Sequence, residues 1–263
     1  MSSHLPSRRS SEGPPIASSR PSLRQPSRWP SGRRRWGLAD AAAGLICAVL
    51  LILLLTSGIF ARVFPSFVAQ YSEWLGYLVV WVPLLGAVLS ATYLRGQRSL
   101  AQDFMVRFRW LDLLWGISIG LLARVITTIL EIAFYGRSGS TALLLDDSLW
   151  VFSALLAPVL IAPVIEELFF RGLLLRALLQ HSSTGFFSNA VFVNIFAIIV
   201  SSLTFALLHV IVATSPLEAL VTGLATLVFG ITAATLALLT KRAGGAIIAH
   251  AVFNALVAVP ALF

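Results

Sequence analysis

Long apolar runs separated by short polar stretches occupy most of the chain after residue 37. A transmembrane α-helix needs about 20 mostly apolar residues to cross the ~30 Å hydrocarbon core of a bilayer. Seven runs approach or exceed that length, although the last is short and contains Pro260. We therefore predict an all-α, polytopic transmembrane helical bundle of about seven spans, at residues 38–61, 74–94, 112–135, 149–170, 189–212, 217–239 and 245–262.

The segment 100–111 has a different pattern. Phe104, Phe108 and Leu111 recur at helical spacing, and charged residues lie elsewhere on the helical wheel. We expect an interfacial helix near 100–111 that leads into the third span, with Trp110 at the level of the lipid head groups.

Composition supports a membrane protein. Of the 263 residues, 58% are apolar and 11% are charged, whereas soluble domains are typically about 45–50% apolar and about 25% charged. These values exclude an ordinary cytosolic enzyme and a disordered regulator. Cys47 is the only cysteine, so no internal disulfide can staple a secreted domain.

The net charge of +8 is concentrated in residues 1–36, which hold eight arginines and only one acidic residue, Glu12. Because the remaining chain is almost neutral, we expect no nucleic-acid partner. This Arg/Ser/Pro-rich tail has few large apolar side chains, and we predict a disordered arm that touches anionic lipid head groups. An organelle transit peptide is the alternative, although six prolines disfavour the amphipathic helix that it would need.

The loops indicate the orientation. With the N-terminus inside, the inner segments carry sixteen Lys and Arg residues, whereas the outer ones carry Arg62 and Arg137 alone. The positive-inside rule therefore predicts a cytoplasmic N-terminus, in a multi-pass protein that we place in the plasma membrane. Because the tail is rich in Arg and Ser, an organelle membrane is the alternative location.

Charged side chains inside the spans each require an explanation, because burying one at mid-bilayer costs at least ~2.5–3.5 kcal/mol. Arg124 and Glu131 lie seven residues apart on one face of the third span, and we interpret them as a structural pair. In the fourth span, Glu167 and Arg171 have the spacing of a helical ion pair. Glu166 is rotated by about 100° from Glu167 and can act as a base.

Two later spans carry further polar groups. His209 follows Phe205 by one helical turn, and His250 lies one turn before Asn254 on the same face. A glutamate base, two histidines and an amide in a cavity of low dielectric constant can activate water and stabilise an oxyanion. The glutamate and histidines could instead ligate a metal.

These residues resemble the three motifs of the CPBP family of intramembrane proteases, also called the CAAX protease and bacteriocin-processing family or Abi family, which includes the type 2 CAAX prenyl endopeptidases. The matching motifs are Glu166-Glu167-x-x-x-Arg171 with Phe170-Arg171-Gly172, Phe205-x-x-x-His209 and His250-x-x-x-Asn254. The resemblance covers about residues 110–263. It implies hydrolysis of a peptide bond in a membrane-associated or prenylated CAAX-type protein, or in a leader-bearing peptide.

The resemblance also implies a role for each residue. Glu166 and His209 would activate water, and His250 and Asn254 would stabilise the oxyanion. Glu167 and Arg171 would support the site, together with Phe205. The family is described as metalloproteases, and any divalent metal, such as zinc, would be held by Glu166, His209 and His250.

We expect three regions: the basic tail at 1–36, N-terminal spans and the interfacial helix at 37–110, and a catalytic membrane domain at 111–263. The partners would be membrane lipids and a protein or peptide substrate. A catalytically silent scaffold or immunity protein and a proton- or ion-coupled carrier are the alternatives.

The expected bounds conflict with this grouping in one respect. His250 would lie about 9 Å from the inner loop, whereas His209 would lie near the opposite end of its span. We therefore expect the fourth and fifth helices to project beyond the bilayer on the inside, or the fifth to tilt.

Overall fold

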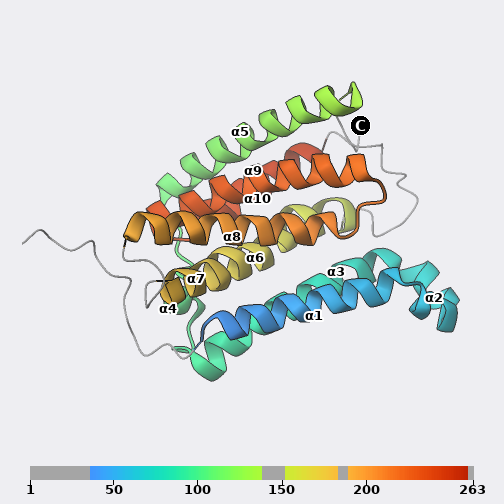
Figure 1. Cartoon of the computed structure of the whole chain (residues 1–263), viewed down its shortest axis with the longest axis horizontal. Coiled ribbons are helices and arrows are strands. Elements are labelled where there is room, and N and C mark those ends of the chain that lie inside the picture. The colour runs from blue at the N-terminus through green and yellow to red at the C-terminus, as the bar shows by residue number, and fades with distance from the viewer. Residues whose placement is uncertain (1–35, 138–151, 183–188, 260–263) are drawn as a thin grey trace, which may run out of the picture. The chain divides into compact units, whose positions relative to one another are not determined.

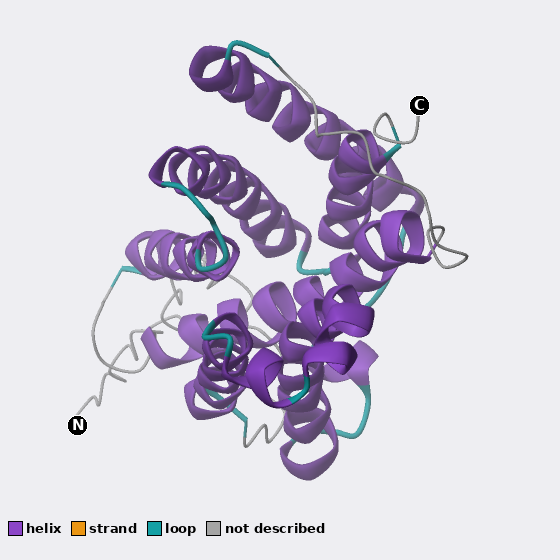
Figure 2. Ribbon diagram, turned by 90° about the vertical axis from the view of Figure 1, so that its right-hand side faces the viewer, coloured by secondary structure: helices purple, strands orange, loops and turns teal. Residues whose placement is uncertain are grey.

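A computed structural model describes residues 36–137, 152–182 and 189–259. These residues belong to one compact unit, Arg33–Phe263, and its described part contains helices and no strands (Figures 1 and 2). The elements are α1 (Leu38–Thr56), α2 (Ile59–Val63), α3 (Pro65–Ser90), η1 (Ala91–Arg95), α4 (Leu100–Asp103), α5 (Trp110–Tyr135), η2 (Phe152–Ile161), α6 (Ala162–Glu167), η3 (Leu168–Leu174), α7 (Leu175–Ser182), α8 (Ala190–Val210), α9 (Pro216–Thr240) and α10 (Gly244–Ala258), where η marks a π-helix.

Seven helical runs of 15 residues or more follow one another in the described residues, as the apolar pattern predicts, beside the short helices α2 and α4. Five of them are long and apolar enough to cross a membrane as single helices: α1, α3 with η1, α5, α8 and α9. The helix α10 is apolar but shorter, at 15 residues. The protein is therefore an all-α integral membrane protein.

The fourth run differs most from its predicted bounds. It was expected at 149–170, but η2, α6, η3 and α7 form one continuous helical run from Phe152 to Ser182. Residues 171–179 are buried, so packing against neighbouring helices supports this extension. Glu166 then lies about 24 Å from the end of this run and His209 about 28 Å from the start of the antiparallel α8, which brings the two to the same level.

The helices pack in two groups (Figure 1). The hairpin of α1 and α3 lies against α6, η3 and α7, whereas α10 contacts α5, α9, η2 and α6, and α8 packs along α9 and α7. Gly116 and Gly120 let α5 approach α10 closely, because a Cβ atom on either would come within 2.7 Å of that helix.

The expectation of an interfacial helix across 100–111 is wrong in its extent. Leu100–Asp103 is helical, residues 104–109 are irregular, and Trp110 and Leu111 are the first residues of α5. The carboxylate of Asp103 accepts hydrogen bonds from the Gln97 N–H and the Trp36 indole, and Met105 adopts a left-handed φ of 55° that ends the helix. Phe104 is buried against Trp36 and Gly172.

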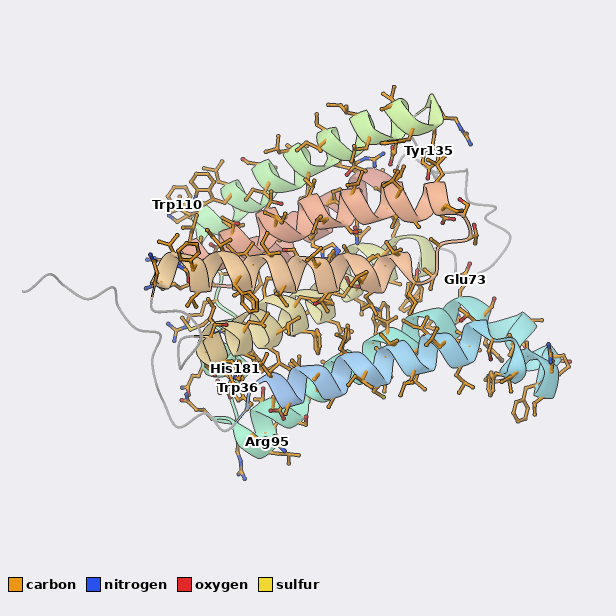
Figure 3. The ribbon with its side chains drawn as sticks, viewed as in Figure 1. Trp36, Glu73, Arg95, Trp110, Tyr135 and His181 are labelled. Carbon is orange, nitrogen blue, oxygen red and sulfur yellow. The ribbon has the colours of Figure 1, made fainter. Side chains whose placement is uncertain are left out.

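The end of the bundle that contains Trp36 and Asp103 is closely packed against α7. Arg176 of α7 donates to the carbonyl of Asp103, and its guanidinium lies over the Trp36 ring. Figure 3 shows Trp36, His181, Arg95 and Trp110 at the end of the bundle opposite Glu73 and Tyr135. The predicted tail therefore ends in a packed residue, Trp36, and the rest of that prediction lies outside the described residues.

A second contact at the same end fixes the start of α10. The Asp112 carboxylate of α5 accepts from Arg242 Nη2 at 2.6 Å and from the Arg109 N–H at 2.8 Å. The hydrogen bond to Asp112 raises the pKa of the Arg242 guanidinium above its ordinary value. This ion pair joins α5 to the turn between α9 and α10, eight residues before His250.

Candidate active site

One carboxylate oxygen lies where three helices meet. Glu166 Oε2, from α6, lies 3.7 Å from His209 Nε2 of α8 and 3.9 Å from His250 Nε2 of α10. That oxygen is buried and accepts no hydrogen bond from the described residues. The structure therefore brings the predicted glutamate and both predicted histidines together, although they are separated by up to 84 positions in the sequence.

The neighbouring carboxylate has a different role in the packing. Glu167 Oε1 accepts from Arg171 Nη1 at 2.8 Å and lies 2.9 Å from His250 Nδ1. Arg171 also donates to the carbonyl of Gly230 on α9. Glu167 and Arg171 are almost fully buried, with 0% and 1% of their side chains exposed. The predicted pair thus exists and links three helices.

The hydrogen bonds at Nδ1 orient both histidines. His209 Nδ1 lies 2.8 Å from the carbonyl of Phe205, which can only accept, so Nδ1 carries the proton. His250 Nδ1 faces the Glu167 carboxylate, which is also an acceptor. Each ring consequently presents Nε2 to Glu166, and neutral His209 offers a lone pair there.

Aromatic rings enclose this polar cluster. Phe205 is buried, its ring lies 4.4 Å from that of His209, and the Arg171 guanidinium lies 4.7 Å above it. Phe229 of α9 contacts both Phe205 and His250. Such rings attract the arginine and lower the local dielectric constant, which strengthens every charge interaction in the cluster.

Asn254 lies beside another element. Its Nδ2 donates to the carbonyl of Pro158 in η2 at 2.7 Å. The expected position on the face of α10 that carries His250 is consistent with this contact, because α10 packs on both η2 and α6.

Exposure identifies the open side of the cluster. The His209 side chain is 30% exposed, whereas those of Glu166 and His250 are 10% and 5% exposed. Of these three side chains, His209 therefore offers the most accessible approach to Glu166.

The donor atoms do not form a metal site as they stand. No group of three His, Cys, Asp or Glu side chains in the described ranges is arranged to hold an ion. A tetrahedral zinc with ligand bonds of about 2.0–2.2 Å requires neighbouring donors about 3.5 Å apart or less. Glu166 and the two histidines are spaced more widely than that.

Sequence reasoning missed Phe229, the carbonyl of Gly230 and the carbonyl of Pro158. Backbone carbonyls leave no signal in a sequence. Phe229 is one of 17 phenylalanines, and nothing in the apolar pattern distinguishes a ring that packs on His250 from one that faces lipid.

A second charged pair lies on α5. Arg124 Nη1 and Nη2 donate to the two carboxylate oxygens of Glu131 at 2.8 and 3.1 Å. The predicted pairing of these two residues is therefore present, as a bidentate contact.

Comparison with known proteins adds the family. Residues 148–256 match the family model described as type II CAAX prenyl endopeptidase Rce1-like. No curated protein and no solved structure matches the chain. The matched range includes every residue of the cluster around Glu166, as well as Asn254. Residues 148–256 of this membrane protein are therefore similar to the type II CAAX prenyl endopeptidase Rce1-like family, a family of intramembrane proteases.

Proposed function

We propose that this chain hydrolyses a peptide bond of a prenylated CAAX-type protein, of another membrane-associated protein or of a leader-bearing peptide, with Glu166 and His209 activating water. The observation that carries the proposal is the convergence of both histidine Nε2 atoms on the unpartnered Glu166 Oε2.

The distance between Glu166 and His209 supports a bridging water. At 3.7 Å, Oε2 and Nε2 are too far apart for a direct hydrogen bond. Both atoms are acceptors when Glu166 is ionised and His209 is neutral. A water molecule that donates one hydrogen to each atom would link them, and its oxygen lone pairs would face a substrate carbonyl carbon.

Hydrolysis then proceeds by five changes that balance. The water oxygen bonds to the carbonyl carbon, and one water proton moves to Glu166. The carbonyl oxygen takes the electron pair and becomes an oxyanion. The carbonyl then re-forms as the C–N bond breaks, and Glu166 returns its proton to the leaving nitrogen.

His250 and Asn254 are proposed to stabilise the oxyanion. With Nδ1–H directed at Glu167, a second proton on Nε2 makes His250 an imidazolium donor. Glu166, Glu167 and Arg171 together carry one net negative charge, so this imidazolium makes the buried cluster neutral. A donor placed in advance for a developing oxyanion contributes about 10²–10³-fold to the rate.

We propose that residues 111–263 form the catalytic domain of a plasma-membrane protein whose N-terminus is cytoplasmic. The family match supports the substrate class, and the count of basic residues in the loops supports the orientation. No step above requires a metal. If a divalent ion were bound, Glu166, His209 and His250 would hold it after moving closer together, and it would polarise the water.

The test compares Glu166→Gln with Glu131→Gln in purified protein. Both variants remove the charge of one intramembrane glutamate, but only Glu166 lies in the histidine cluster. Quenched fluorescent peptides, prenylated CAAX and unprenylated leader-type, report cleavage. We expect loss of cleavage in Glu166→Gln and retention in Glu131→Gln. Full activity of folded Glu166→Gln would overturn the mechanism, and the peptide that is cleaved identifies the substrate class.

A further inference from the structure

A proline interrupts the backbone pairing of η2 shortly before the catalytic glutamate. In a π-helix, the carbonyl of residue i accepts from the N–H of residue i+5. By this spacing, the Pro158 carbonyl would pair with residue 163, but Pro163 has no N–H. The π-helical segment ends at Ile161, next to this break.

Asn254 supplies the missing donor. Its Nδ2 donates to the Pro158 carbonyl at 2.7 Å across 96 residues of sequence. A carbonyl without a partner costs about 1–3 kcal/mol when it is fully buried, and this one is partly buried between two helices, so the contact has a stabilising function of its own. It also joins α10, which carries His250, to the helical run that carries Glu166.

We infer that Pro163 is a positioning residue for the oxyanion hole, an inference that rests on the proposed function. Because Pro163 leaves the Pro158 carbonyl free, that carbonyl holds one N–H of the Asn254 amide. The carboxamide can then neither flip nor swing away, and the second N–H on the same nitrogen is left for the substrate oxyanion. The missing backbone donor in one helix therefore orients a side chain on another.

Pro163→Ala tests the inference, because alanine restores an N–H that can compete for the Pro158 carbonyl. We expect kcat to fall about tenfold with KM within about twofold, since orientation matters chiefly in the transition state. The unfolding temperature should not fall, because alanine favours a helix more than proline does. Pro83→Ala in α3 is the matched control. It also removes a proline from inside a membrane helix, and it should leave kcat unchanged.

A double-mutant cycle separates positioning from general damage. Asn254→Ala should lower kcat about 10²-fold, and adding Pro163→Ala to it should have no further effect, because Pro163 acts through Asn254. The inference would be overturned if the losses in kcat of the two single variants multiplied in the double variant. It would also be overturned if Pro163→Ala kept full kcat. Either result leaves the proposed function intact as long as Glu166→Gln is inactive. Pro163→Ser restores the same N–H, and it replaces Pro163→Ala in the cycle if that variant does not fold.

Discussion

Two ion pairs of the described residues each lie within a single membrane helical run, and they differ in what surrounds them. Arg171 and Glu167 are buried and connect to His250 and to the carbonyl of Gly230. Arg124 and Glu131 lie on one helix, bond to each other in bidentate geometry and are 13% and 19% exposed. The buried pair, which contacts a histidine on another helix, is therefore the stronger candidate for a reaction site.

The largest expected effect is that of Arg171→Met. This change leaves the Glu167 carboxylate buried without its cation, which typically destabilises a protein by about 3–5 kcal/mol. We expect loss of cleavage together with a clearly lower unfolding temperature in detergent. Arg171→Met that keeps the stability of the unmodified protein would show that Glu167 does not depend on this arginine.

Removing both charges of this pair separates stability from activity. In the double variant Glu167→Leu with Arg171→Met, no unpaired charge remains, and similar replacements of buried pairs are often neutral or stabilising. We expect the unfolding temperature to recover to that of the unmodified protein. Cleavage should stay at least about 10²-fold reduced, because His250 loses the acceptor that orients its Nδ1. Recovery of cleavage would remove Glu167 from the proposed site.

Removing the cation of the Arg124–Glu131 pair on α5 should change stability and cleavage less. Arg124→Met removes the cation that binds Glu131 where this carboxylate is partly exposed, so we expect a loss of about 1–2 kcal/mol in unfolding free energy. Cleavage by the folded variant should stay within about twofold, measured at a temperature where both proteins are folded. A loss of activity comparable to that of Arg171→Met would mean that the two pairs do not differ in function.

Treatment with a metal chelator should change the cleavage rate least of all. Because the donors of Glu166, His209 and His250 are too widely spaced for a tetrahedral ion, we expect cleavage to survive prolonged treatment with a chelator. The measurement is the initial rate before and after treatment, with zinc added back to a third sample. Loss of activity that zinc restores would show that the three side chains move together around an ion.

The apolar pattern predicted the all-α membrane fold but not every helix bound, and the polar residues predicted which side chains lie together around Glu166. The spacing of Glu167 and Arg171 on one helical face anticipated their ion pair, and the charge of Glu166 inside an apolar run marked it as exceptional. The end of the fourth helix could not be read from hydropathy, because residues 171–182 include Arg171, Arg176 and His181 and resemble a loop. Their burial depends on neighbours such as Trp36 and Asp103, which are distant in sequence.

The helix 100–111 was overestimated for a related reason. Its apolar spacing is real, but the helix ends at Asp103, whose carboxylate accepts from the Trp36 indole and the Gln97 N–H, and Met105 then adopts a left-handed φ of 55°. The tertiary contact between Trp36 and Asp103, which lie 67 residues apart in the sequence, therefore overrode the local helical pattern. The Asn254 contact with Pro158 was equally invisible, since its acceptor is a backbone atom.

The wide separation of Glu167 and His250 in the sequence has a consequence for biogenesis. During synthesis, the helix with two adjacent glutamates leaves the ribosome 83 residues before the histidine that completes its cluster. At about 5–20 residues per second, that interval lasts about 4–17 seconds. Arg171, four residues away, can neutralise Glu167 throughout this time, but Glu166 has no such local partner. Membrane insertion of this helix should therefore be inefficient when it is expressed alone and should improve when α8 to α10 follow it from the translocon.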